Sequence, residues 1–321
     1  DPIELIEKYG AVGVRVGMLL TSPAGNDLPF DEVLCEQGRN FSNKIWNALR
    51  LVKGWEVDKN IDQPEDASVS QAWFRNRLNE TLAVINDHFD KYRISDALMA
   101  VYKLIWDDFC SWYLEMVKPA YQSPVDAKTR SVTIEFFEEL MKILHPFMPF
   151  ISEEIWHHLA DRKEDKCLMI SGMPAAGKVD QKMLSEFDYV KEVVMGIRKV
   201  RKEKNIANRD ELRLLIKKNE GKKPKTTFDP VVKKLCKLSD LGYTDEKEEG
   251  AVSFVIRSTE FYIPLEGAID KDAEIEKLEA ELKYTRGFLS GVEKKLSNER
   301  FINNAPEQVV AKERKKQSDA E

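Results

Sequence analysis

The stretch GRNFSNKIWNALR, residues 38–50, decides the fold because one helix there carries two patterns. Its apolar residues Phe41, Ile45 and Leu49 recur every four positions, with Trp46 beside them, which predicts an amphipathic helix with one buried face. The opposite face carries donors and charges, namely Arg39, Asn43, Lys44, Asn47 and Arg50. Arginine, lysine and asparagine beside an aromatic side chain suit phosphates and unstacked bases. The stretch therefore predicts either a nucleic-acid-binding face or an ordinary solvated helix.

Long helical patterns fill the first half of the chain and predict an antiparallel helical bundle. They cover about residues 31–53, 68–89, 95–118 and 126–144, followed by a shorter one over 152–160. Ser68 or Ser70, Ser95 and Asp126 are the predicted N-caps. The aromatic stripe on the third pattern is expected to lie in the core instead of forming a platform for bases.

The pattern changes after residue 161, where Gly172, Pro174 and Gly177 mark a linker. A helix around residues 187–197 and a short one around 231–235 are expected there. Apolar alternation at residues 212–216, 252–256 and 261–265 predicts strands. This segment therefore predicts a small α/β module.

The C-terminal segment shows the most regular spacing in the chain. Apolar positions follow one another at intervals of three and four in the set Ile275, Leu278, Leu282, Thr285, Leu289, Val292 and Leu296, which is a heptad pattern. The pattern breaks near residue 298, Pro306 stands where a new helix would begin, and a second helix follows over 307–316. A short break between two helices favours an antiparallel coiled-coil hairpin. Dimerisation through the same seam is the alternative.

Composition indicates a helix-rich, globular protein with an uneven charge. Charged residues make up 33% and apolar residues 42% of the 321 residues, and the net charge is −6. Residues 191–234 nevertheless hold 15 Lys and Arg against 6 Asp and Glu. Such asymmetry predicts a basic surface on an acidic body, with a merely solvated surface as the alternative. No apolar run is long enough to span a membrane, so no membrane partner is expected.

No catalytic or metal-binding constellation is recognisable. The four cysteines are far apart without a CxxC pair, which predicts reduced thiols of a cytosolic protein. His157 and His158 are adjacent and so diverge on a helix, which makes them a poor metal pair. No phosphate-loop pattern occurs. The chain by itself is therefore expected to catalyse nothing.

The order of several segments resembles the C-terminal half of class I aminoacyl-tRNA synthetases, most closely the valyl enzymes. These segments are DPIELIEKYGA at 1–11, SPAGND at 22–27, RNF and NKIWNA within 39–48, IWDDFC, WYLE and KP within 105–119, LHPFMPFISEEIW at 144–156, the spaced pattern over 197–206 and the spaced pattern over 294–314. The last segment distinguishes the valyl enzymes from the isoleucyl enzymes, because isoleucyl relatives typically end in a cysteine-rich zinc module. Residues 12–14, VGV, replace the commoner Asp-Ala-Leu of the family.

The resemblance implies a mainly α protein in four parts. They are a stem-contact segment (1–30), an anticodon-binding helical bundle (31–165), a small α/β module with a basic surface (166–268) and a coiled-coil tRNA-binding arm (269–321). The predicted tRNA-binding residues are Arg39, Asn43, Lys44 and Asn47 on the bundle, Arg198, Arg201, Lys202 and Lys204 on the module, and Lys312, Arg314, Lys315 and Lys316 on the arm.

The resemblance also implies a function. The intact enzyme would ligate valine to tRNA(Val) with ATP and Mg²⁺, in the cytoplasm and as a monomer. Its HIGH and KMSKS motifs, nucleotide-binding fold and editing domain are absent from these residues, so this part would bind tRNA, without a cofactor, beside its own catalytic and editing domains. The tRNA-binding region of an isoleucyl or methionyl enzyme, or a coiled-coil scaffold for a protein partner, are the alternatives.

Overall fold

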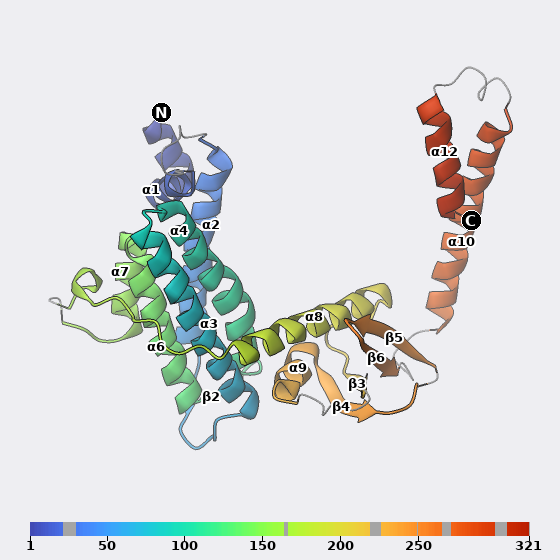
Figure 1. The fold of residues 1–321 in the computed structure, drawn as a ribbon. Helices are drawn as coiled ribbons and strands as arrows, with labels where there is room; N and C mark the ends of the chain where they lie inside the picture. The colour runs from blue at the N-terminus through green and yellow to red at the C-terminus, as the bar shows by residue number, and fades with distance from the viewer. Residues whose placement is uncertain are drawn as a thin grey trace.

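The computed structural model describes residues 1–21, 30–163, 166–218, 226–248, 250–264, 271–298 and 307–320. Figure 1 shows a bundle of long helices, a small sheet flanked by two helices, and a separate pair of helices. The predicted mainly α fold, with a helical bundle, a small α/β module and a C-terminal helical hairpin, is confirmed.

The bundle contains α1 (Pro2–Leu20), α2 (Glu32–Lys53), α3 (Glu65–Asp90), α4 (Ile94–Lys103), α6 (Ala127–Leu144) and α7 (Pro149–Leu159). Helix α4 continues through a π-helical segment, Leu104–Tyr113, into α5 (Leu114–Val117). Two short strands, β1 (Val57–Asp58) and β2 (Val125–Asp126), pair in parallel at the lower end of the bundle in Figure 1.

Local chemistry sets the helix starts. The Asp126 carboxylate accepts a hydrogen bond from the Thr129 amide at 2.7 Å, which confirms this predicted cap. The predicted serine caps are wrong. Helix α3 begins directly after Pro64, so Ser70 lies inside the helix, where its hydroxyl donates to the Asp66 carbonyl. Ser95 lies in the first turn of α4 and instead donates to the Leu19 carbonyl of α1 at 2.7 Å.

Aromatic rings fill the centre of the bundle. Phe74 on α3 contacts Phe109, Tyr113 and Phe136, with ring centroids 4.9–5.3 Å apart. All four side chains are buried. The prediction that the aromatic stripe of the third helical pattern is core is therefore confirmed for Phe109 and Tyr113.

Helices α1 and α2 pack backbone against backbone through glycines. A Cβ atom added at Gly17 would lie 2.7 Å from the Cys35 sulfur and 2.9 Å from the Cys35 amide nitrogen. At Gly13 it would lie 2.8 Å from the Cys35 carbonyl oxygen. The VGV sequence that departs from the family pattern thus places a glycine at a close helix crossing.

The small module is a four-stranded sheet with the order β4-β3-β6-β5. Its elements are α8 (Gln181–Glu203), β3 (Leu212–Lys217), α9 (Asp229–Cys236), β4 (Leu238–Thr244), β5 (Ala251–Ile256) and β6 (Thr259–Pro264). Strands β3 and β4 are parallel, and α9 provides the crossover that this geometry requires. The sequence did not predict β4, an edge strand of which only Leu238 is buried.

Helix α8 joins the module to the bundle (Figure 1). Its Phe187 ring lies 4.0 Å from that of Trp73 on α3, measured between centroids. Beside this pair, the Lys191 ammonium lies 3.2 Å from the Asp108 carboxylate. Burial raises the pKa of Asp108, and Lys191 partly opposes that effect.

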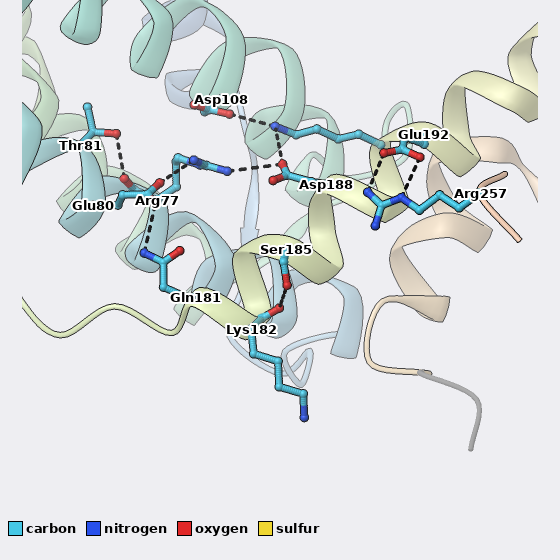
Figure 2. A network of polar contacts seen from close by, with 11 residues as sticks. Arg77, Glu80, Thr81, Asp108, Gln181, Lys182, Ser185, Asp188, Glu192 and Arg257 are labelled. Atoms are coloured by element: carbon cyan, nitrogen blue, oxygen red, sulfur yellow. Dashed lines mark hydrogen bonds and ion pairs between the residues drawn. The ribbon is translucent and has the colours of Figure 1, made fainter. Parts of the chain in front are cut away.

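Further ion pairs continue along α8 in both directions. Figure 2 shows Asp188 beside Arg77 of α3, with a separation of 3.5 Å, and Arg257 of the β5–β6 turn on Glu192, at 2.6 Å. One helix therefore makes charged and aromatic contacts with the bundle near its start and with the sheet further along. We refer to the contacts of Trp73, Asp108, Phe187 and Lys191 as the α8 joint.

Helices α10 (Lys271–Leu296) and α12 (Glu307–Ala320) lie side by side as a hairpin (Figure 1). The seam residue Val292 is buried, whereas Leu282 remains 52% exposed. Residues 299–306, which carry the predicted break, lie outside the described residues, as do residues 22–27.

Candidate nucleic-acid interface

Some side chains on the polar face of α2 are exposed, and others are engaged in contacts within the protein. Asn43 and Asn47 lie one turn apart, and both are exposed. Arg39 is half-buried, because its guanidinium donates to the Lys8 carbonyl of α1 and pairs with Glu36, both at 3.3 Å. Arg39 therefore ties α2 to α1, and the two amides, with the exposed Arg50, form the accessible part of the predicted face.

Lys44 lies against an aromatic pair. Its ammonium is 5.1 Å from the centroid of the Trp106 ring, which in turn stacks on Tyr102 at 5.5 Å. A cation held over an aromatic face is attracted to it by about 0.5–2 kcal/mol. This contact positions the Lys44 charge beside the exposed amides without burying it fully.

Three of the four basic residues predicted on α8 lie at its surface. Arg198 and Lys202 are exposed and one turn apart, and Lys204 is half-buried. The Arg198 guanidinium lies 5.9 Å from the Trp112 ring centroid. The last turn of α8 therefore presents positive charge beside the bundle.

The structure corrects the expectation for Arg201. Its side chain is 5% exposed and donates to the carbonyls of Ala207, Asp210 and Cys236 at 2.8–3.0 Å. Burial lowers the pKa of Arg201. Its guanidinium connects α8 to the loop before β3 and to the end of α9, so it has a structural role and does not face RNA phosphates.

The arm carries its predicted cations on α12. Lys312, Arg314 and Lys315 are exposed. The side chain of Lys316 lies outside the described residues. The predicted residues thus lie on three separate elements, α2, α8 and α12, which suits a long ligand better than a small molecule.

A groove that the sequence did not indicate lies beside Arg198. It has a volume of about 750 Å³ and is lined by the end of α5 and the loop after it, by α8, and by the end of α9. Lys118, Lys234 and Lys237 add positive charge to its walls. Lys118-Pro119 had marked only a helix end, and nothing local in the sequence brings the lysines of α9 to the same place.

The cysteines Cys110 and Cys236 are buried, and the two adjacent histidines of α7 are paired. Burial raises the pKa of the Cys110 and Cys236 thiols to about 12, which keeps them protonated and poorly nucleophilic. His157 and His158 each pair with the glutamate one turn earlier on α7. Within the described part of the chain, no group of three His, Cys, Asp or Glu side chains is arranged to hold a metal ion. Of the helices that the structure describes, none is both long and apolar enough to cross a membrane.

Comparison with known proteins finds two family models that match this chain. The anticodon-binding domain of tRNA ligase matches residues 71–216, and the valyl tRNA synthetase tRNA binding arm matches residues 270–321. These matches confirm the resemblance inferred from the sequence.

Alignments over the whole length of this chain agree with the domain matches. The valine–tRNA ligases of Christiangramia forsetii and Parabacteroides distasonis are 55% and 53% identical to this chain, over 100% of it and 36% of their own length. That of Listeria innocua serovar 6a is 37% identical over 99% of this chain and 37% of its own. The chain therefore spans little more than a third of the length of the curated relatives it matches.

Proposed function

The chain carries the anticodon-binding domain of tRNA ligases together with the tRNA-binding arm of valyl-tRNA synthetases, and from this premise we propose that it binds and selects tRNA(Val) for a valine–tRNA ligase. The observation that carries the proposal is the match of both domain models to one chain whose whole length aligns with 36% of such a ligase. The intact enzyme would join valine to the tRNA using ATP, with the chemistry performed outside these residues.

The α2 face would read the anticodon. Anticodon bases are unpaired, and proteins recognise such bases by hydrogen bonds to their edges and by stacking. The exposed amides of Asn43 and Asn47 each offer both donors and an acceptor, which a base edge requires. Arg39 and Lys44, held in place by α1 and Trp106, would add positive charge near the adjoining phosphates.

The basic end of α8 and the arm would hold the RNA backbone. Phosphate contacts position a nucleic acid without specifying its sequence. Arg198, Lys202 and Lys204 would supply about three such contacts on the body, so a log–log plot of affinity against salt should fall with a slope of about −2 from this region. The cations of α12, Lys312, Arg314, Lys315 and Lys316, would bind a more distant part of the tRNA.

The α8 joint supports this division of tasks. Because a single helix is fixed to the bundle and to the sheet, the α2 face and the basic end of α8 keep one separation before RNA arrives. A preorganised surface loses less conformational entropy on binding than one that must be ordered. The rigid joint would therefore favour RNAs in which the anticodon loop and the backbone match that separation.

The remaining properties follow from the same family membership. The part of the enzyme represented here would act as a monomer in the cytoplasm, beside its own catalytic and editing domains. ATP and Mg²⁺ would bind in the catalytic part.

Fluorescence anisotropy tests the proposal directly. The chain is titrated into labelled tRNA(Val) and into a copy with a different anticodon, at about 50 and about 150 mM salt. We expect binding of the native tRNA that is roughly tenfold tighter than that of the swapped copy. The double variant Asn43→Ala/Asn47→Ala should remove this preference, whereas Lys312→Ala should weaken both tRNAs equally. Equal binding of the two tRNAs by the unaltered chain would refute the anticodon assignment, and absence of binding would refute the function.

A further inference from the structure

The groove beside Arg198 is built from three elements that are distant in sequence. Its lining comes from the loop that follows α5, around Pro119 and Tyr121, from the α8 surface at Ile197 and Arg198, and from the end of α9 at Lys237. Its volume of about 750 Å³ lies in the range of ligand-binding clefts.

The charges around the groove divide into engaged and accessible groups. Lys118 pairs with Glu115 at 2.6 Å, and Lys234 pairs with Asp66 of α3 at 2.7 Å. Arg201 is buried on its three carbonyls. The cations that remain exposed at the groove are Arg198 and Lys237. The site therefore keeps two positive charges for a ligand, while Glu115 and Asp66 are both neutralised by lysines.

An aromatic side chain stands at the rim of the groove. Tyr121 is 91% exposed, although a tyrosine in a folded protein usually buries most of its ring. Its loop has a defined backbone, because the Ser123 amide donates to the Ala120 carbonyl at 3.0 Å and Gln122 adopts a left-handed φ of 61°. The ring is therefore presented on a turn, with one face available for stacking.

We propose that this groove takes one unpaired nucleotide of the bound tRNA, whose base stacks on Tyr121 and whose phosphate pairs with Arg198 and Lys237. The inference rests on the proposed function and assigns a second contact, distinct from the α2 face. Stacking on an aromatic ring tolerates every base, because each base has a π face. The groove thus grips an extruded nucleotide without reading its identity, whereas the amides of α2 contact base edges.

Tyrosine variants test the stacking contact. The probe is the isolated anticodon stem–loop of tRNA(Val), and the readout is its affinity for the full chain by fluorescence anisotropy. Tyr121→Ala should weaken binding by about tenfold, and Tyr121→Phe, which keeps the ring, should bind as the unaltered chain does. Tyr92→Ala is the matched control, because Tyr92 is 81% exposed on the turn at the other end of α3. That helix has 26 residues, which places the control roughly 39 Å from Asp66 and the groove.

Charge variants test the phosphate contact by its salt dependence. Arg198→Ala and Lys237→Gln should each reduce the magnitude of the log–log salt slope by about 0.7, the value for one single-stranded phosphate. Lys199→Ala is the control on the same helix, because Lys199 points about 100° away from Arg198 and pairs with Glu203. It should leave the slope unchanged.

The outcomes separate this inference from the function on which it rests. If Tyr121→Ala and Tyr121→Phe weaken binding equally, or neither differs from Tyr92→Ala, the groove takes no stacked base and the inference fails while tRNA binding stands. If a perfectly paired duplex of the stem binds as tightly as the stem–loop and is equally weakened by Tyr121→Ala, the groove does not hold an unpaired nucleotide. If the unaltered chain binds no tRNA, both the inference and the proposed function fail.

Discussion

The α8 joint and the C-terminal arm are both helical contacts, but they bury side chains to very different extents. At the joint, Trp73 and Phe187 are fully buried against each other, with Lys191 and Asp108 paired beside them. In the arm, Val292 is the one buried side chain among those the structure describes, and Phe288 stays 42% exposed. The joint thus has the packing of a protein core, whereas the arm has a narrow seam.

This difference bears on the role that we propose for each region. Burial of apolar area contributes about 25 cal/mol per Å², so the joint is stabilised strongly before any ligand binds. A hairpin with a narrow seam gains little from packing and depends more on helix propensity and on its ligand. The body would therefore set the geometry of recognition, while the arm would adapt to the RNA. Mutations matched between the two regions test this contrast.

The largest expected effect comes from removing a ring at the joint. Phe187→Ala should lower the free energy of unfolding of the body by about 3–5 kcal/mol, because it leaves a cavity between Trp73, Trp112 and Phe228. The matched change in the arm, Phe288→Ala, should cost less than about 1 kcal/mol. Urea unfolding followed by tryptophan fluorescence measures the first cost, because all six tryptophans lie within residues 46–156, and the helical circular dichroism of the arm in urea measures the second. Equal costs at the two positions would contradict the contrast.

Replacing a glycine by alanine should lower stability in the body and raise it in the arm. Gly17→Ala forces a Cβ to within 2.9 Å of the Cys35 sulfur and amide nitrogen, so α1 must shift from α2, at a cost of about 1–3 kcal/mol. Gly287→Ala in α10 meets nothing within 4 Å and should stabilise that helix by about 1 kcal/mol. Thermal unfolding of the body and the helical circular dichroism of the arm report the two effects. Stabilisation by Gly17→Ala would disprove the close crossing of α1 and α2.

The sequence predicted the elements that depend on local chemistry. Helical periodicity identified the bundle, and Asp126 was recognised as a cap because its carboxylate bonds to an amide three residues away. Ser70 had the right chemistry for a cap, but Pro64 allowed α3 to begin earlier. Strand β4 escaped notice because an edge strand with one buried residue has no clear alternation, and its pairing with β3 is a long-range contact.

The candidate site was less predictable, because it depends on which charges the fold leaves exposed. Arg198 and Arg201 are three residues apart and indistinguishable by composition, yet one is exposed and the other lies on three carbonyls. Two of those carbonyls belong to the loop that directly follows α8, and the third comes from the end of α9, 35 residues beyond Arg201 along the chain. Tyr121 likewise is an ordinary loop residue in the sequence, and only the fold brings it into one groove with α8 and the end of α9. Motif reasoning therefore predicted regions that would bind RNA, while only the structure showed that Arg198 is exposed and Arg201 is buried.

The smallest effect expected is a pH dependence confined to the body. Burial raises the pKa of Asp229 from 3.8 to about 6, although the Tyr243 hydroxyl donates to its carboxylate at 2.9 Å and opposes the shift. Because the folded-state pKa lies above the unfolded one, the folded state binds more protons between these values. The contribution of Asp229 to stability is therefore greatest below about pH 4 and declines as the pH rises through 6. The loss should be on the order of 1 kcal/mol, since the side chain is only half-buried.

Variants that move this pKa in known directions isolate the effect. In urea unfolding from pH 4 to pH 7, Asp229→Asn should make the decline shallower, because no titrating group remains at that position, while the raised pKa of Asp108 still contributes. Tyr243→Phe should deepen it, since the carboxylate loses the hydroxyl that favours its charged form. Gly287→Ala, whose change lies in the arm, should leave the pH profile unaltered. If the stability of Asp229→Asn falls with pH as steeply as that of the unaltered chain, the titrating group lies elsewhere in the body. Asp229 then makes no pH-dependent contribution to stability.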